Sequence, residues 1–484
     1  MTKTSALRVR FAPAPTGMMH LGNVRTALFN YLFAQQKGAT FILRIEDTDT
    51  QRNYDPEAQH IIADLMWLGL EYDHGPIKGG PDAPYFQSQR DEIYQEHLET
   101  LIKNNQVYRC FCTPEELEKK RHRQLALKLP PRYDRACAQL TTEQIQNNLH
   151  NNVPFIWRIM LDQSKTVTIH DLAHGTIHFD FKNFADFPLT RADGKATFIF
   201  ANFVDDMLMK ITHVIRGEDH LTNTACQAAL YQIFNYPLPT FLHMPIICNA
   251  EGKKLSKRDF GFSLKDLQSG GYLPQAINNY LAIIGGGTFK SEVMSLEELV
   301  HALNFDTMKS TGHVRYDVEK LRWFNHKWIE RLDPKELLEL CVPFLTQAYP
   351  HVNQMDKSTL SAILQIIKSD LHTLADAPQA LSFLFIEPSV DPKELHHMMP
   401  DQELSQIAKI IEKNLSLINK SKEFVETLKV KAKEANIPLN HVFWFVRLSL
   451  IGKKQGPALH DLIDILGTPQ ATDRIKKVTS LFSY

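Results

Sequence analysis

Apolar residues in the first third of the chain recur with two different periods. Short apolar runs at 7–11 and 41–45 indicate strands. Each precedes a helical pattern, over 24–37 and 56–68, in which apolar residues return every three or four positions. A glycine follows each helical pattern, where a chain often leaves the helical conformation. This order of strand, helix, strand and helix predicts βαβ units and a parallel sheet.

Beyond residue 90 the pattern changes and then returns. Two helical segments and then three strand-like segments are expected over 90–104, 114–127, 154–160, 166–170 and 176–181. Strands over 197–203 and 211–216 resume the parallel pattern. We therefore predict a doubly wound α/β domain formed by 1–90 and 197–248, with an inserted α+β domain over 91–196.

The last third of the chain has a different character. From about residue 330 the pattern is almost wholly helical, with clear segments over 361–371, 404–414 and 424–435. This predicts a separate all-α domain over 334–484, after a connecting region over 249–333.

The composition fits a soluble chain of several domains. It has 484 residues, of which 43% are hydrophobic and 23% charged, and ~150 residues per domain suggests about three domains. No apolar stretch approaches the ~20 residues of a membrane span, and the first ten residues lack the apolar core of a secretory signal. Six cysteines are too few for a disulfide scaffold. We expect a cytoplasmic protein with reduced thiols and no membrane partner.

The net charge of −1 excludes a strongly basic nucleic-acid-binding arm but permits local basic patches. Two segments, 118–135 and 410–460, are rich in lysine and arginine. Each is either a solvated helix face or a contact for a polyanion.

A loop with a chemical signature joins the first strand to the first helix. It contains Gly17, His20, Gly22 and Asn23. Glycines allow close approach of the backbone to a ligand, and the free N–H groups of a helix start favour anions such as phosphate. The alternative is an ordinary strand-to-helix turn with a packed histidine.

A second cluster lies far downstream, over 251–258. It includes Lys254, Ser256 and Lys257 within a run of basic residues. These charges repel one another unless they are solvated or face a polyanion, so the loop is either simply exposed or placed to stabilise charge on a phosphate group.

Together the two clusters resemble the signature motifs of class I aminoacyl-tRNA synthetases. His20-Leu-Gly-Asn23 is similar to the HIGH motif, and Lys254-Leu-Ser-Lys-Arg258 to the KMSKS loop. Further segments resemble bacterial glutamyl-tRNA synthetase from end to end: 10–13, 24–27, 44–49, 204–206, 211–220, 320–325 and 452–475. The resemblance implies a Rossmann-like catalytic domain, an inserted acceptor-binding domain, a stem-contact region and an α-helical anticodon-binding domain.

The implied reaction joins glutamate to tRNA-Glu through a glutamyl-adenylate, with ATP as substrate and Mg²⁺ bound through its phosphates. No protein nucleophile is needed, so catalysis is positioning plus electrostatic stabilisation. By resemblance His20, Lys254 and Lys257 are catalytic. The expected ATP-binding residues are Gly17, His20, Gly22, Asn23, Lys254, Ser256 and Lys257.

The same resemblance assigns a glutamate pocket. Arg10 and Arg216 form the clamp for the side-chain carboxylate, because guanidinium groups pair bidentately with carboxylates. Glu46 receives the α-ammonium group, and the pocket is completed by Ala12, Phe198 and Asn202.

This chain departs from the family at three positions near the pocket. Ala14 replaces a usual serine, Phe198 a usual tyrosine and Ile199 a usual polar residue. Up to two hydroxyl groups are missing, each worth about 0.5–1.5 kcal/mol of binding. We predict weaker glutamate affinity with an unchanged substrate.

Cysteines in the inserted region resemble a zinc site of some relatives. Cys110, Cys112 and Cys137 match its thiolates, but Gln139 occupies the position of the usual histidine. Tyr133 matches a tyrosine ligand of a truncated relative, so three thiolates and Tyr133 are one candidate set of zinc ligands. The alternative is three buried thiols that pack as small apolar groups.

The expected partners are tRNA-Glu, glutamate and ATP, bound by a monomer. A tRNA-Gln-misacylating enzyme and a catalytically silent tRNA-binding paralogue are alternatives. Another rival, which glutamylates a modified tRNA base, lacks the helical domain, so the residues after 333 argue against it.

Overall fold

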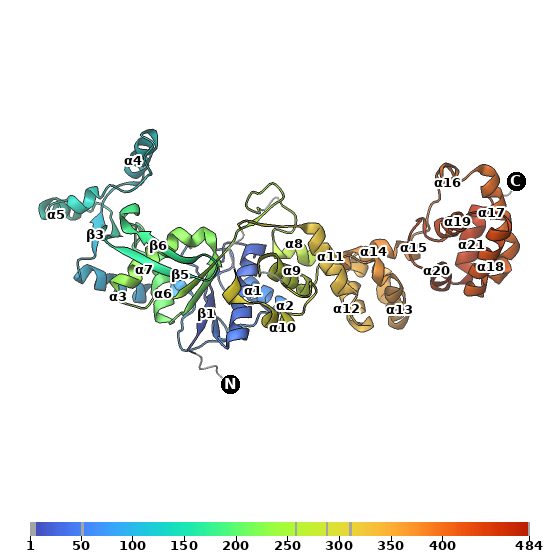
Figure 1. Ribbon diagram of the computed structural model, residues 1–484, viewed down its shortest axis with the longest axis horizontal. Helices are drawn as coiled ribbons and strands as arrows, with labels where there is room; N and C mark the ends of the chain where they lie inside the picture. The colour runs from blue at the N-terminus through green and yellow to red at the C-terminus, as the bar shows by residue number, and fades with distance from the viewer. Residues whose placement is uncertain (1–5, 50–52, 257–258, 287–288, 309–311, 483–484) are drawn as a thin grey trace. The chain divides into compact units, whose positions relative to one another are not determined.

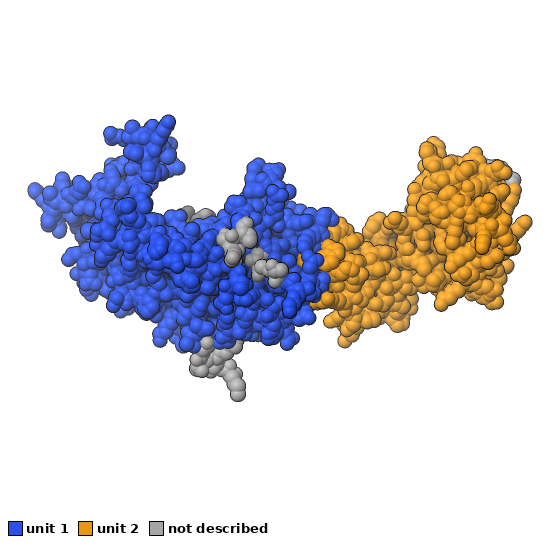
Figure 2. All heavy atoms as spheres, in the orientation of Figure 1, with its two compact units in different colours: residues 1–267, 274–321 blue, residues 268–273, 322–484 orange. Residues whose placement is uncertain are grey.

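The computed structural model describes residues 6–49, 53–256, 259–286, 289–308 and 312–482. The chain forms two compact units (Figure 2), one of residues 1–267 and 274–321 and one of residues 268–273 and 322–484. The first unit mixes strands and helices, whereas the described part of the second is helical (Figure 1). The prediction of an α/β region followed by an all-α region is confirmed. The finer domain boundaries stay a prediction.

A parallel strand pair begins the first unit. β1 (Arg8–Phe11) pairs in parallel with β2 (Thr40–Leu43), and α1 (Leu21–Lys37) connects them. α1 ends where Gly38 adopts a left-handed backbone with φ 65° and donates its N–H to the carbonyl of Ala34. α2 (Gln59–Leu68) follows β2 and buries its apolar face. The predicted βαβ unit is therefore confirmed.

Four further strands lie in the order β6-β5-β8-β7. Their bounds are β5 (Thr166–Asp171), β6 (Gly175–Asp180), β7 (His213–Gly217) and β8 (Thr240–Met244), with α7 (Leu221–Ile233) between β7 and β8. β8 is parallel to β7 and, at Asp171 and Phe241, to β5, while β5 and β6 form an antiparallel hairpin. β1 lies beside β7, where Thr212 N–H donates to the Arg8 carbonyl at 3.0 Å.

The strand predicted over 197–203 is wrong. These residues enter α6 (Phe198–Leu208), for which Thr197 is the N-cap. Aromatic and β-branched residues favour a strand by local propensity. In the structure Phe200, Val204 and Met207 are buried at helical spacing, so burial of a helix face outweighs that propensity. The strand predicted over 211–216 is confirmed as β7.

A mixed region separates α2 from β5. Its elements are α3 (Asp91–Lys103), β3 (Val107–Cys110), α4 (Pro114–Ala126), α5 (Thr142–His150) and β4 (Ile156–Ile159). β3 and β4 pair antiparallel. α4 starts with a capping box between Thr113 and Glu116 but buries none of its residues, so it projects from the unit (Figure 1).

Short elements follow β8: β9 (Ile247–Cys248), α8 (Leu264–Ser269), α9 (Pro274–Gly286), α10 (Leu296–Ala302) and β10 (Val314–Arg315). Leu21 N–H donates to the Phe262 carbonyl at 3.0 Å, and Leu264 N–H to the Met19 carbonyl at 2.8 Å. These bonds attach the segment after the lysine-rich loop to the start of α1.

From α11 (Val318–Ile329) onward the described chain is helical. The helices are α12 (Pro334–Ala348), α13 (Lys357–Ile367), α14 (Ala377–Ala380), α15 (Ser382–Phe385), α16 (Pro392–Met398), α17 (Asp401–Asn414), α18 (Ser421–Glu434), α19 (Leu439–Ile451), α20 (Leu459–Leu466) and α21 (Thr468–Thr479). No helix among the described residues has the length and apolar character needed to cross a membrane.

Replacing Phe203 by alanine tests the packing of α6. Its ring lies 4.9 Å from that of Tyr231, nearly perpendicular to it, and is 1% exposed. We expect Phe203→Ala to lower the free energy of unfolding of the first unit by about 3–5 kcal/mol, measured by denaturant titration of the full chain. Leu208→Ala, on the same helix but 38% exposed, is the control. Equal losses of unfolding free energy in the two variants would contradict the assignment of a helix to Phe198–Leu208.

Candidate active site

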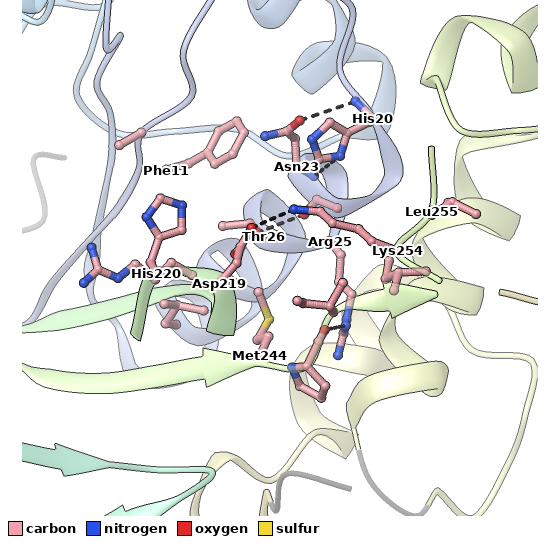
Figure 3. A pocket seen from close by; sticks show the side chains of 18 of the residues that line it. Phe11, His20, Asn23, Arg25, Thr26, Asp219, His220, Met244, Lys254 and Leu255 are labelled. Carbon is pink, nitrogen blue, oxygen red and sulfur yellow. Dashed lines mark hydrogen bonds and ion pairs between the residues drawn. The ribbon is translucent and has the colours of Figure 1, made fainter. Parts of the chain in front are cut away.

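A cavity of about 270 Å³ lies where β1, β7 and β8 end and α1 begins (Figure 3). This is the edge of an open α/β sheet at which ligands bind. Most of the predicted site residues line it: Arg10, Ala12, His20, Gly22, Asn23, Glu46, Phe198, Asn202, Arg216 and Lys254.

His20 forms the N-cap of α1 and faces the cavity. The ring nitrogen Nδ1 of His20 accepts a hydrogen bond from the backbone N–H of Asn23 at 3.3 Å. The backbone N–H of His20 donates to the side-chain oxygen of Asn23 at 3.5 Å (Figure 3). Because Nδ1 is an acceptor, the neutral ring carries its proton on Nε2. Burial, together with the charge of Lys254, lowers the pKa of His20 to about 4. His20 therefore presents a neutral N–H donor at a helix N-terminus.

Gly22 is required by His20 itself. A Cβ atom at this position would lie 2.9 Å from the His20 ring, which is too close. Gly22 also lines the cavity, so its predicted role of leaving room for a ligand stays a prediction. Gly17 lies apart from the main cavity and lines a neighbouring one with Ala14 and Thr16.

The described part of the lysine-rich loop is held by acidic partners. Lys254 Nζ pairs with Asp219 Oδ2 at 2.8 Å (Figure 3). Ser256 donates both its backbone N–H and its hydroxyl to Asp259, at 2.8 and 2.9 Å, and is not among the residues that line the cavity. Lys257 lies outside the described residues.

A buried ion-pair network forms one wall of the cavity. Asp206 accepts two hydrogen bonds from Arg10, with Nε 3.1 Å from Oδ1 and Nη2 3.2 Å from Oδ2. It also accepts a hydrogen bond from Arg44 Nη1 at 2.7 Å. Arg44 Nη2 reaches Glu46 Oε1 at 3.1 Å, and Asn202 donates to the same oxygen. Burial raises the pKa of Glu46, although Arg44 and Arg10 oppose the shift.

Arg216 lines the same cavity but has different hydrogen-bond partners. Its guanidinium contacts Thr224, Gln227 and His243, and no carboxylate of the described residues lies within ion-pair distance. Burial lowers the pKa of Arg216 to about 9, and the nearby charge of Arg10 adds to the shift. A buried cation without a direct counterion is a favourable place for a ligand carboxylate.

Sequence reasoning missed several residues of the cavity. Arg25, Asp219 and His220 line it, although the sequence motifs assign none of them a role. All three lie in segments that carried the family resemblance, 24–27 and 211–220, and Asp219 lies two residues after the end of β7. The position after a parallel strand was the available signal.

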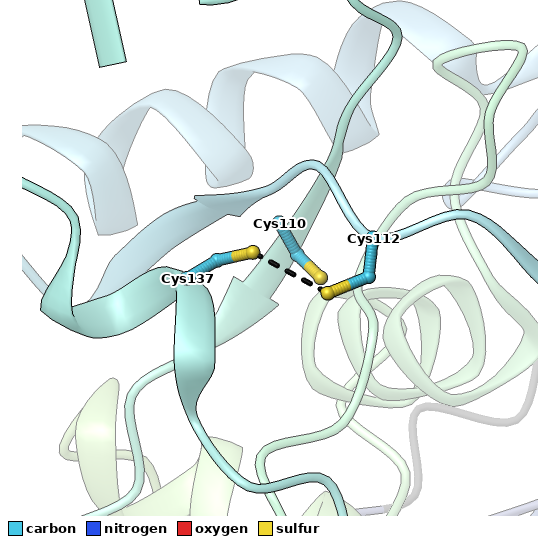
Figure 4. A group of neighbouring side chains, drawn as sticks. All are labelled: Cys110, Cys112 and Cys137. Atoms are coloured by element: carbon cyan, nitrogen blue, oxygen red, sulfur yellow. Dashed lines mark hydrogen bonds between the residues drawn. The ribbon is translucent and has the colours of Figure 1, made fainter. Parts of the chain in front are cut away.

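The three cysteines of the inserted region come together (Figure 4). Their sulfur atoms lie within 4.8 Å of one another, and Cys112 Sγ is 3.5 Å from Cys137 Sγ. The Tyr133 hydroxyl lies 3.3 Å from Cys110 Sγ and 3.6 Å from Cys112 Sγ, whereas Gln139 is exposed. Against the effect of burial, hydrogen bonds from Tyr133 and Arg158 lower the pKa of Cys110.

Comparison with known proteins agrees with this geometry. Residues 6–323 match the family model of the catalytic domain of class I tRNA synthetases (E and Q), and residues 336–479 match an anticodon-binding domain. The chain is 33% identical to glutamate–tRNA ligase 2 of Caldicellulosiruptor saccharolyticus, over 98% of this chain and 99% of the relative. It is 35% identical to the glutamate–tRNA ligase of Sulfurihydrogenibium sp., over 98% of this chain and 99% of that relative.

Solved structures show the same similarity. A glutamate tRNA ligase from Elizabethkingia meningosepticum, in complex with its amino acid, has a TM-score of 0.85 and 31% identity, and the match covers 98% of this chain and 99% of that one. The fold, the cavity and these matches define a class I tRNA synthetase of the glutamate and glutamine group. Within that class, the chain belongs to the glutamate–tRNA ligases.

The depressed pKa of His20 predicts a pH-dependent contribution to stability. The unfolded histidine binds a proton below its ordinary pKa of 6.5, whereas the folded one does so only near 4. Stability is therefore lost as the pH falls through this window, by about 1–2 kcal/mol at pH 5. In His20→Asn the asparagine can still cap α1, but its side chain does not bind a proton in this pH range.

We expect the melting temperature of the wild type to fall more between pH 7.5 and pH 5.0 than that of His20→Asn, measured by calorimetry in the same buffers. The other histidines are common to both proteins, so the difference isolates His20. Equal falls contradict a neutral His20.

Proposed function

We propose that this chain ligates L-glutamate to tRNA-Glu in two steps, through an enzyme-bound glutamyl-adenylate, with release of AMP and pyrophosphate. One observation carries the proposal: a single cavity joins an anion-binding helix start, at His20, to a buried arginine without a carboxylate partner, Arg216. The first feature suits the phosphates of ATP, and the second suits the side-chain carboxylate of glutamate.

In the first step an oxygen of the glutamate α-carboxylate attacks the α-phosphorus of ATP, and the bond to the β-phosphate breaks. His20 donates its Nε2 proton as a hydrogen bond to a phosphate oxygen, and Asn23 supports that ring. Lys254 leaves Asp219 for the phosphates, and Lys257 stabilises the charge that develops on them. Mg²⁺ accompanies the nucleotide and supplies further charge neutralisation.

Glutamate is recognised by both cationic and anionic groups of the cavity. Arg216 and the free Nη1 of Arg10 bind the side-chain carboxylate. Glu46, held by Arg44 and Asn202, receives the α-ammonium group. An incoming ammonium also favours the ionised form of Glu46, which burial disfavours.

In the second step a hydroxyl of the terminal adenosine of tRNA attacks the carbonyl carbon of the adenylate, and AMP leaves. The exposed basic helix α4 and its flanking segment over 118–135 hold the acceptor end. The helical domain holds the anticodon, with Lys453 and Lys454 near the phosphates. Arg447 donates to the carbonyls of Lys454 and Pro457, at 3.1 Å each, so its role is to shape this surface.

Parallel charging of purified tRNA-Glu and tRNA-Gln with labelled glutamate tests the proposal, with Lys257→Ala as the inactive control. We expect charging of tRNA-Glu alone, by a cytoplasmic monomer. Charging of tRNA-Gln would identify a misacylating enzyme, and charging of neither at high glutamate would identify a silent tRNA-binding paralogue.

We also propose a structural zinc ion bound by Cys110, Cys112, Cys137 and Tyr133. Tetrahedral zinc with Zn–S bonds of ~2.3 Å separates its sulfur ligands by about 3.8 Å. The distance of 3.5 Å between the Cys112 and Cys137 sulfurs, and the position of the Tyr133 hydroxyl, fit such a site. When bound, zinc joins β3 to the 133–137 segment.

Metal analysis of protein purified without chelator checks the zinc proposal. We expect about one zinc per chain in the wild type and a loss of most of it in Cys137→Ser, because one of the four ligands is removed. Cys226→Ser, a buried thiol outside the cluster, is the matched control and should retain zinc. A wild-type content well below one contradicts the proposal.

Restoring the usual tyrosine tests the altered pocket. Phe198 lines the cavity, and its ring lies 5.6 Å from that of His220. We expect Phe198→Tyr to lower the KM for glutamate by about 2–10-fold, the value of one hydrogen bond, measured by steady-state charging. Ile199 packs against the core and does not line the cavity, so Ile199→Thr should leave that KM unchanged. No gain from the tyrosine contradicts the prediction of weakened affinity.

A further inference from the structure

Behind Arg216 lies a buried aspartate–histidine pair that the reaction does not use. Asp171 Oδ2 lies 2.6 Å from His243 Nδ1 and also accepts the backbone N–H of His243 at 3.1 Å. Both side chains are 0% exposed. The other oxygen, Oδ1, accepts the N–H groups of Ala173 and His174, each at 2.9 Å, in the turn after β5. Asp171 is therefore fixed from two sides.

This arrangement determines which ring nitrogen of His243 carries the proton. Burial lowers the pKa of His243, whereas that of Asp171 is lowered by its hydrogen bond to the histidine. Asp171 is thus ionised and His243 neutral, with its proton on Nδ1. Nε2 is then an acceptor, and it lies 2.8 Å from the Thr224 hydroxyl and 3.5 Å from Arg216 Nε. The Thr224 hydroxyl also contacts Arg216 Nη2.

The needs of the substrate explain why His243 lies between the carboxylate of Asp171 and the guanidinium of Arg216. A carboxylate in direct contact with Arg216 would occupy the donors that a substrate needs. A buried guanidinium with no negative charge nearby would be costly. The charges of Asp206 and Glu46 act on the Arg216 guanidinium without direct contact. The neutral His243, held by Asp171, lies against Nε, while Thr224 and Gln227 take Nη2, so Nη1 has no hydrogen-bond partner among the described residues and is left for a ligand.

We propose that Asp171 and His243 are positioning residues that hold the guanidinium of Arg216 toward the side-chain carboxylate of the amino-acid substrate, and thereby set the affinity for glutamate. This inference rests on the proposed function, because it takes Arg216 as a ligand of glutamate. It adds two residues from β5 and β8, neither of which lines the cavity.

Asp171→Asn tests the proposal with little change in volume. If the asparagine keeps its oxygen on the turn amides, its NH₂ group faces His243 Nδ1. The histidine proton must then move to Nε2, where it opposes the N–H of Arg216. We expect the KM for glutamate to rise at least ~10-fold, while the KM for ATP stays within about twofold and kcat at saturating glutamate within about threefold.

Asp186→Asn is the matched control. Asp186 is 1% exposed, accepts hydrogen bonds from Tyr108 and the Leu161 N–H and pairs with Arg135 at 2.6 Å, and no contact between it and Arg216 is found. Melting temperatures of both variants report the purely structural cost. A rise in the glutamate KM of Asp171→Asn no larger than that of Asp186→Asn, or an equal rise in the KM for ATP, overturns the proposal.

Two variants of His243 keep the test decisive if Asp171→Asn does not fold. His243→Gln retains an acceptor near the position of Nε2, whereas His243→Leu does not. We expect the glutamate KM of the leucine variant to exceed that of the glutamine variant at least ~5-fold; equal values overturn the proposal.

Arg216→Lys separates this inference from the proposed function. If that variant leaves the glutamate KM unchanged, the assignment of Arg216 itself fails. If it raises the KM while Asp171→Asn does not, only the positioning role fails.

Discussion

The carboxylate of Asp206, shared between two buried guanidinium groups, is the interaction on which the site depends. It joins Arg10 of β1 to Arg44, which follows β2, from a position on α6. The neighbouring Asp205 accepts Arg90 Nε at 2.7 Å. Removing one partner of such a buried pair leaves a charge without compensation and costs about 3–5 kcal/mol. The network therefore fixes the strands and α6 relative to one another before any substrate is present.

The network also distributes charge across the cavity. Asp205, Asp206 and Glu46 compensate the guanidinium groups on their own side. Among the described residues Arg216 has only neutral hydrogen-bond partners, and the charges of Asp206 and Glu46 act on it without direct contact, so it retains its capacity to bind a carboxylate. The cavity thus has a cationic wall that suits the side chain of glutamate, and Glu46 for its ammonium group. His20 and Lys254 border the part of the same cavity that suits the phosphates.

Much of this could be predicted from the sequence, because it follows from local pattern. The strands around residues 9 and 42, their connecting helix and the helical last third each have a clear period. The motifs at His20 and Lys254 identified the residues of the helix start and the loop. The strand predicted over 197–203 failed because α6 is stabilised by packing and by ion pairs from distant residues, which no local period shows. Two features depend on contacts between segments far apart in the chain: the Asp171–His243 pair and the neutral hydrogen-bond partners of Arg216. The resemblance pointed to Tyr133 beside the three thiols, and the structure brings its hydroxyl within 3.6 Å of two of the sulfur atoms.

A crystal structure of the protein with bound glutamate tests the central claim most directly. The account predicts the side-chain carboxylate within hydrogen-bond distance of Arg216 and the ammonium group at Glu46, with the bidentate contact between Arg10 and Asp206 intact. Glutamate bound with its ammonium group toward Arg216, or an Arg10 side chain that has left Asp206 to reach the ligand, would contradict it.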